Sequence, residues 1–358
     1  MKGLVTLLLI AFFCVSFATG IELVAFPTQT TYLGATWSYY SIVAYMGNPP
    51  QESSLVLDGG LDIFYLFSPE CVQPGCGETT FNSSASSSFQ STGQSLNYTY
   101  AAGNLNAVGI IGSDDASIAG LNVPNQNFGL VNIFSQPNYF PTGSEATGVF
   151  GYAFPSPDYG QLSYVANIYA TNPDIGSELL ALWLPSNIYD MGRLHIGAPD
   201  SSYYTGPINY IPLLPSNFAS KDYPFFWSNV ITDIEVNGVS NGYCKRRTCN
   251  FFVDTAGRPM DLANAIPAIP INANCSNLNE LPTYSFIINN VNYTLPPEKY
   301  IIRVIGKDGT VTCESGINGG SVIPYPFTLG YTWIQNFYTV FDFANKRFGF
   351  ATALQNIN

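Results

Sequence analysis

Short apolar runs rich in aromatic and β-branched residues recur along the chain, and glycine and proline separate them. The 358 residues include 32 Gly and 25 Pro, and aromatic side chains are more frequent than charged ones, 15% against 10%. This pattern is typical of short β-strands joined by turns, and no long amphipathic helix pattern interrupts it. The sequence therefore predicts an all-β protein.

Two of these apolar runs end in an aspartate that small residues follow. One reads SSLVLDGG, with its carboxylate at Asp58, and the other reads NFFVDTAG, with its carboxylate at Asp254. A repeat of this kind predicts a carboxylate pair at a pseudo-two-fold axis, where two like charges resist ionising together and share one proton. The alternative is that two ordinary turns recur by chance, since Asp-Gly is a common hairpin signal.

The first twenty residues read as a secretory signal. A basic start at Lys2 precedes an apolar stretch, and Ala18 and Gly20 form a small-residue exit, as in signal peptides. No later apolar run approaches membrane-spanning length. We therefore expect residues 1–20 to be removed, with no membrane span left, and the chain to reach an extracellular or lysosome-like compartment.

The length of the chain predicts how many lobes it forms, and its net charge restricts the kinds of partner that it can bind. Without the signal the chain still exceeds the size at which one core keeps growing, so we expect two lobes. The net charge of −12 argues against nucleic-acid binding, which needs a basic footprint. Only 12 Lys and Arg are present, so few cations repel one another once carboxylates are protonated, which suits an acidic compartment.

Cysteine, histidine and asparagine positions predict covalent features. Cys14 falls in the signal and leaves six of the seven cysteines, and an even number in an exported chain favours disulfides over zinc. These residues alone do not fix the pairing. The one histidine, His195, lies in an apolar run where a structural role is expected, so we expect neither a metal site nor a cofactor. Four N-x-S/T motifs predict glycans, at Asn82, Asn97, Asn274 and Asn292.

Six segments, taken in order, resemble one protease family from about Tyr39 to Ala353. After the Asp58 segment come CVQPGC, LNYTYAAGNLNAVGIIGSD, ATGVFGYAFPS, RLHIGAPDSSYYTGPINYIPL and FTLGYTWIQNFYTVFDFANKRFGFA. Their order and spacing are similar to those of the pepsin-like aspartic endopeptidases, peptidase family A1. The resemblance implies an all-β, bilobal fold with two β-barrel-like lobes, pseudo-two-fold symmetry and a central cleft.

The resemblance also implies a domain layout and a set of disulfides. The N-terminal lobe would span 21–203 and carry the flap and the first catalytic aspartate, and the C-terminal lobe would span 204–358 and carry the second. The protein would be a monomer. The implied disulfides are Cys71–Cys76, Cys244–Cys249 and Cys275–Cys313.

In this family two aspartates, here Asp58 and Asp254, hold a water between them. One ionised carboxylate acts as general base on the water while its protonated partner polarises the scissile carbonyl. The substrate-binding positions that the resemblance implies are Tyr100 at the flap, Gly60, Ala256 and Tyr65, the last standing where the family usually has tryptophan. The partner would be a peptide or protein substrate in the cleft.

Both aspartate loops depart from the family pattern of Asp-Thr/Ser-Gly-Ser/Thr. Gly59 lacks the second-position hydroxyl that normally locks the two loops together, whereas Thr255 retains it. Leu61 and Gly257 lack the fourth-position hydroxyl that normally donates to the carboxylate, and such a loss typically costs about 1–3 kcal/mol. Ala256 replaces a glycine. We expect weakened activity that rises when the family residues are restored at these four positions together.

Three further departures lie near the loops. Arg258 replaces a small hydroxyl residue, and a guanidinium turned inward would ionise both carboxylates; we expect it to point outward along the cleft rim. Tyr331 and Thr147 each replace an aspartate behind the site.

Residues 21–40 contain no Lys or Arg, so we expect no basic inhibitory prosegment.

Three functions are consistent with these residues. The first is a secreted or lysosomal aspartic endopeptidase with impaired catalysis. The second is a catalytically inactive pseudoprotease that binds peptides as a glycoprotein. The third is a secreted glycoprotein that uses the fold for surface interactions.

Overall fold

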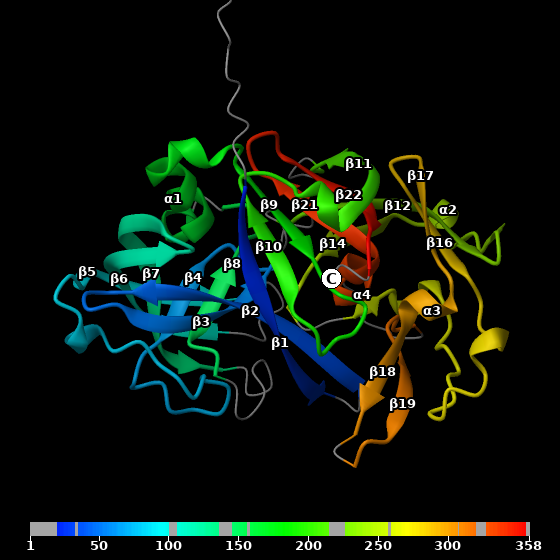
Figure 1. Ribbon diagram of the computed structural model, residues 1–358, viewed down its shortest axis with the longest axis horizontal. Helices are drawn as coiled ribbons and strands as arrows, with labels where there is room; N and C mark the ends of the chain where they lie inside the picture. Colours follow the sequence, from blue (N-terminus) through cyan, green and yellow to red (C-terminus); the bar gives the residue numbers. More distant parts are fainter. Residues whose placement is uncertain are drawn as a thin grey trace, which may run out of the picture.

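Strands dominate the structure, a computed structural model that describes residues 20–32, 35–99, 106–135, 145–155, 158–214, 226–256, 259–306, 308–319 and 327–355 (Figure 1). Within these ranges no helix is long and apolar enough to cross a membrane. All but the last residue of the predicted signal at 1–20 lie outside the described residues, as do the flap residue Tyr100, Gly257 and Arg258.

The largest sheet contains thirteen strands in the order β11-β22-β21-β9-β10-β1-β2-β3-β8-β4-β7-β6-β5. Its strands are β1 (Ile21–Tyr32), β2 (Ala35–Met46), β3 (Gln51–Asp58), β4 (Phe64–Phe67), β5 (Gln90–Thr99), β6 (Asn106–Ile118), β7 (Leu121–Phe134), β8 (Gly148–Gly151), β9 (Leu179–Trp183), β10 (Gly192–Ile196), β11 (Tyr204–Pro212), β21 (Phe337–Asp342) and β22 (Arg347–Ala353).

A second sheet of seven strands lies in the C-terminal half. It contains β12 (Ser228–Val236), β13 (Val239–Ser240), β14 (Cys249–Val253), β15 (Met260–Asp261), β16 (Tyr284–Ile288), β17 (Val291–Leu295) and β20 (Phe327–Leu329). A separate pair is formed by β18 (Ile301–Ile305) and β19 (Val311–Ser315).

The helices are short and lie around the sheets. The α-helices are α1 (Tyr164–Thr171), α2 (Tyr243–Arg246), α3 (Pro297–Tyr300) and α4 (Tyr331–Asn336), and 3₁₀ turns span Ser83–Ala85, Gly160–Leu162, Pro173–Ile175, Ser201–Tyr203, Ala263–Ala265 and Leu278–Glu280. Ser163 caps α1 by accepting the N–H of Ala166 at 3.2 Å, which satisfies one of the unpaired donors of the first turn.

The two halves of the chain meet in the middle of the large sheet. Strand β9 from the first half pairs with β21 from the second, and β11 pairs with β22. Strand β1 runs from β10 to β2 and so belongs to both parts of the sheet. Figure 1 shows β3 to β8 on one side, β12, β16 and β17 on the other, and β9, β10 and β21 between them. The predicted all-β fold with two lobes is confirmed, while the lobe boundary at 203/204 stays a prediction.

The core runs through both lobes and explains why the strands end where they do. Leu57 and Val253, the residues directly before the two aspartates, are fully buried in one continuous hydrophobic cluster. Burying a Leu or Val side chain contributes about 1.5–3 kcal/mol relative to leaving it exposed. The apolar runs therefore anchor the strands, and the small residues that follow allow the chain to turn immediately after each carboxylate.

Candidate active site

The two aspartates occupy equivalent places in a repeated arrangement of strands. Strand β3 ends at Asp58 and runs parallel to β8, with Leu57 opposite Phe150 and Asp58 opposite Gly151. Strand β14 stops one residue before the second aspartate and runs parallel to β20. An antiparallel strand completes each unit, β4 beside β8 and β15 beside β20. The internal repeat predicted from the two apolar runs is thus present in the backbone.

Both carboxylates are buried and held by their own loops. Asp58 is 3% exposed and Asp254 is 6% exposed. The N–H of Gly60 donates to Oδ1 of Asp58 at 2.7 Å, and the N–H of Ala256 donates to Oδ1 of Asp254 at 2.8 Å. Hydrogen bonds of this kind favour the charged form of a carboxylate and fix its orientation. Gly60 and Ala256 were predicted as substrate-binding positions, and in the structure their backbone N–H groups bind the carboxylates.

The two aspartate loops are in direct contact. The hydroxyl of Thr255 donates to the carbonyl oxygen of Leu57 at 2.8 Å, which joins the residue after one aspartate to the residue before the other. Thr255 is fully buried, so water does not compete for this bond. The two carboxylates therefore lie on loops that touch each other, while the sharing of one proton between them stays a prediction.

A tyrosine that the sequence did not single out joins this contact. The hydroxyl of Tyr152 lies 2.7 Å from Oγ1 of Thr255. Burial raises the pKa of Tyr152 well above its usual value, and the charges of Asp254 and Asp58 raise it further. One signal could have found it. Tyr152 follows Gly151 at the end of β8, and Tyr331 follows Gly330 directly after β20. Strands β8 and β20 pair with the two strands that lead to the aspartates.

Tyr65 lies fully buried beneath the first loop. Its pKa is raised well above the usual value, mainly by burial and also by the charge of Asp58. Among the described residues its hydroxyl has no hydrogen-bond partner. The partner expected from the family resemblance, Tyr100, lies outside the described residues, so the role of Tyr65 stays a prediction.

A second polar pair ties the first loop to the hairpin of β5 and β6. The hydroxyl of Tyr98, in β5, donates to Oδ1 of Asp62 at 3.0 Å. Asp62 is only 6% exposed, and the ring of Tyr98 meets that of Tyr159 edge-on with centroids 5.1 Å apart. Sequence reasoning missed this pair because the two residues belong to different motifs.

The other substituted positions fit behind the loops. Leu61 is 1% exposed and packs in an apolar cluster with Ile63 and Tyr65. Thr147 accepts the N–H of Ser54 at 3.2 Å. Tyr331 is fully buried, as a position behind the site would be.

The described residues form three disulfides. They are Cys71–Cys76, Cys244–Cys249 and Cys275–Cys313, with Cα–Cα distances of 5.8, 5.4 and 5.3 Å. These are the pairings that the family resemblance implies.

The four predicted glycan sites are exposed: Asn82, Asn97, Asn274 and Asn292. In three of them the side-chain amide oxygen already accepts a hydrogen bond within its own motif. Asn82 accepts from the hydroxyl of Ser84 at 2.7 Å, Asn274 from the backbone N–H of Ser276 at 3.2 Å, and Asn292 from the hydroxyl of Thr294 at 3.2 Å. Glycosylation at these positions stays a prediction.

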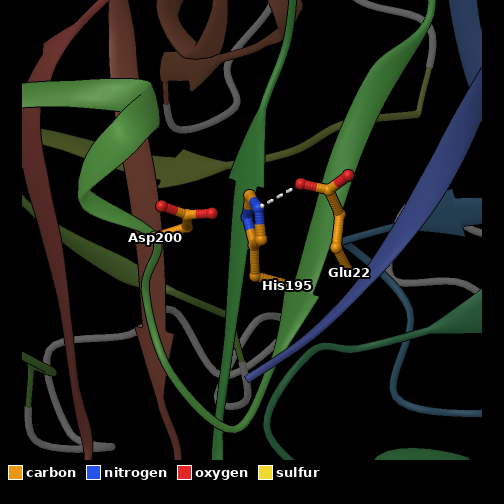
Figure 2. A group of neighbouring side chains, drawn as sticks. All are labelled: Glu22, His195 and Asp200. Carbon is orange, nitrogen blue, oxygen red and sulfur yellow. Dashed lines mark hydrogen bonds and ion pairs between the residues drawn. The ribbon is translucent and has the colours of Figure 1, made fainter. Parts of the chain in front are cut away.

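His195 forms a separate polar group in the central sheet, between Glu22 and Asp200 (Figure 2). Its Nε2 lies 3.2 Å from Oε2 of Glu22, and its Nδ1 lies 3.0 Å from the hydroxyl of Tyr338. That hydroxyl accepts the backbone N–H of Asp200 at 3.0 Å, so its proton points to Nδ1 and Nε2 carries the ring proton. Tyr203 donates to Glu22 at 2.7 Å.

Protein groups satisfy this histidine without a cation. Ligand atoms of Glu22, His195 and Asp200 lie within 4.8 Å of one another, but both ring nitrogens are already bonded. Burial lowers the pKa of His195, against the opposing effect of Glu22, while Arg193 acts in the same direction as burial. We interpret the group as a structural network that fastens β1 to β10, where Glu22 lies opposite His195.

Comparison with known proteins extends over both lobes. The profile of the eukaryotic aspartyl protease family matches residues 38–353, a range that includes both aspartate loops. Pepsin A of Suncus murinus is 31% identical over 86% of this chain and 79% of its own length. Cathepsin E of Rattus norvegicus is 29% identical over 88% of this chain and 80% of its own length. Pepsin II-2/3 of Oryctolagus cuniculus is 28% identical over 92% and 84%, respectively.

Proposed function

Because this chain belongs to the eukaryotic aspartyl protease family, we propose that it is an exported aspartic endopeptidase that uses Asp58 and Asp254. The observation that carries the proposal is the pair of buried aspartates on loops joined through Thr255. The ionised carboxylate would take a proton from a water while the protonated partner polarises the peptide carbonyl. Two carboxylates a few Å apart resist ionising together and would share one proton, which would supply one acid and one base.

The loops support this chemistry with backbone donors. The N–H groups of Gly60 and Ala256 hold one oxygen of each carboxylate, so orientation does not depend wholly on the fourth-position hydroxyls that Leu61 and Gly257 lack. Fixed donors cost no reorganisation during the reaction. We propose that catalysis is retained but weaker than in a protease with hydroxyl residues at those positions.

A second candidate is a peptide-binding pseudoprotease. It is favoured by Leu61, which places an apolar side chain, 1% exposed, where the family has a hydroxyl that donates to the carboxylate. Such a protein would keep the cleft and bind peptides without cleaving them.

We further propose that the protein is a monomeric glycoprotein of the secretory route. Three disulfides support an oxidising compartment, and exposed asparagines at all four N-x-S/T motifs support glycosylation. The destination would be extracellular or lysosome-like.

The test is cleavage of an unstructured protein substrate by the purified, glycosylated chain at acid pH, with and without pepstatin. Cleavage that pepstatin blocks, and that is lost in Asp254→Asn, supports the endopeptidase. Binding of pepstatin without cleavage supports the pseudoprotease. If pepstatin does not bind and the substrate is not cleaved, both the endopeptidase and the pseudoprotease are excluded, and the surface-interaction glycoprotein remains.

A further inference from the structure

Gly59 lies where the pseudo-symmetry would place a second locking hydroxyl. Thr255 reaches the carbonyl of Leu57, so the equivalent residue of the other loop, Gly59, should reach the carbonyl of Val253. An ideal Cβ built on Gly59 would lie 2.9 Å from that oxygen. The position therefore faces the equivalent carbonyl, but the loops lie so close that the backbone would have to shift to admit a side chain.

The space beside Gly59 is occupied by Tyr152. The same ideal Cβ would lie 3.2 Å from the Tyr152 hydroxyl and 3.3 Å from its Cε2. The resemblance of the segment ATGVFGYAFPS to the pepsin-like family, which has DGILGLAYPS there, implies a leucine at the position of Tyr152, and leucine has no polar side-chain atom. The loss of a hydroxyl at position 59 and the gain of one at position 152 thus occur at adjoining sites.

The direction of the hydrogen bonds follows from the partners. The carbonyl of Leu57 can only accept, so the proton of the Thr255 hydroxyl points to it. Oγ1 of Thr255 therefore accepts from Tyr152, whose hydroxyl lies 2.7 Å away. The raised pKa of Tyr152 keeps this donor protonated. The result is a relay from Tyr152 through Thr255 to the backbone of the Asp58 loop.

The backbone and ring of Tyr152 are anchored to both lobes. Its N–H donates to the carbonyl of Asp58 at 2.9 Å, and its own carbonyl accepts Nε1 of Trp227 at 2.7 Å. Its ring packs edge-on against Phe341 with centroids 5.0 Å apart. At 2% exposure the phenol has little freedom, so its hydroxyl is held in place for Thr255.

We infer that Tyr152 is a positioning residue that replaces the missing hydroxyl of Gly59 and locks the two aspartate loops through Thr255. The effect on catalysis rests on the proposed function, but the lock itself does not. The lock through Tyr152 also explains how the Asp58 loop can lack a hydroxyl at Gly59 while Thr255 of the other loop keeps its hydrogen bond to Leu57.

Tyr152→Phe removes only the hydroxyl and tests the effect on catalysis. We expect kcat to fall about tenfold, the effect of losing one buried hydrogen bond at the site, with KM little changed. The two limbs of the pH–rate profile should move closer together, because looser loops weaken the coupling between the carboxylates. The matched control is Tyr164→Phe, since Tyr164 is fully buried and its hydroxyl has no partner among the described residues. An unchanged pH profile in Tyr152→Phe, or an equal change in the control, overturns the inference.

A double-mutant cycle in thermal unfolding tests the lock without any activity. Tyr152→Phe and Thr255→Val should each lower Tm by roughly 2–4 °C, and the double variant should lose clearly less than the sum, because both remove the same relay. Thr255→Ser keeps the hydroxyl, so its Tm should lie much closer to that of the wild type than the Tm of Thr255→Val does. Additive losses overturn the lock. If the wild-type chain cleaves nothing, the proposed function fails while this cycle still decides the inference.

Discussion

Replacing Gly59 with alanine tests how closely the two aspartate loops approach each other. The added Cβ would lie 2.9 Å from the carbonyl oxygen of Val253 and 3.2 Å from the hydroxyl of Tyr152. The first neighbour is backbone and the second belongs to an anchored ring, so neither can move away cheaply. The backbone of Gly59 is outside the left-handed region, so steric contact is the whole native-state cost.

The magnitude follows from two opposing effects. Overpacking a close-packed site typically costs about 1–3 kcal/mol, and replacing glycine stabilises by about 0.4–1 kcal/mol through the unfolded chain. We expect Gly59→Ala to lower the free energy of unfolding by about 1–2 kcal/mol. In a Tyr152→Leu background the cost should shrink, because one of the two close neighbours is removed.

The assay is urea denaturation at neutral pH, with Gly160→Ala as the control. Among the described residues, an ideal Cβ at Gly160 would meet only Pro155, at 3.5 Å, an ordinary contact, so this variant should be as stable as the wild type or slightly more stable. If Gly59→Ala unfolds at the same urea concentration as Gly160→Ala, the close approach of the loops is refuted.

Two further predictions concern the central sheet and the disulfides. Because the pKa of His195 is lowered from 6.5 in the folded protein, the unfolded chain binds more protons as pH falls, and wild-type stability drops on acidification. The Tm advantage of the wild type over His195→Gln should therefore shrink between about pH 7.5 and pH 5, and parallel curves would contradict this. Removing Cys275–Cys313, which closes a loop with a sequence separation of 38, should cost about 4 kcal/mol. Removing Cys71–Cys76, with a separation of 5, should cost about 2 kcal/mol; equal losses in urea denaturation would refute the loop-length argument.

The strands that carry the aspartates could be predicted from the sequence. Leu57 and Val253 close apolar runs whose burial holds each strand in place, and the small residues after Asp58 and Asp254 leave room for the backbone donors observed there. This part of the site depends on local sequence, which is why the pattern was sufficient.

The contact of Thr255 with the other loop was expected from the family resemblance and is observed, but the surroundings of Gly59 could not be predicted in this way. The sequence alone predicts that a hydroxyl returned at position 59 helps to lock the loops, as one of four changes made together. The structure places Tyr152 and the carbonyl of Val253 against that position, so we expect the set of four to gain more when Tyr152→Leu is added. Packing between segments nearly a hundred residues apart decides this, and no local pattern records it.

The network around His195 was equally hidden. The sequence predicted a structural histidine, but its partner Glu22 is fixed by the register between β1 and β10, and Tyr338 comes from β21. Each residue has an ordinary local environment in the sequence. Their meeting follows from the strand order of the central sheet.

The most direct test of the central claim is the activity of the wild-type chain beside Asp58→Asn and Asp254→Asn. The substrate would be an unstructured protein at about pH 4, where a carboxylate pair that shares one proton holds one ionised and one protonated group. The account predicts slow cleavage by the wild type, full inhibition by pepstatin, and no cleavage by either variant, with all three proteins equally folded. Cleavage that survives in either variant, or a wild type that neither cleaves the substrate nor binds pepstatin, would contradict the account.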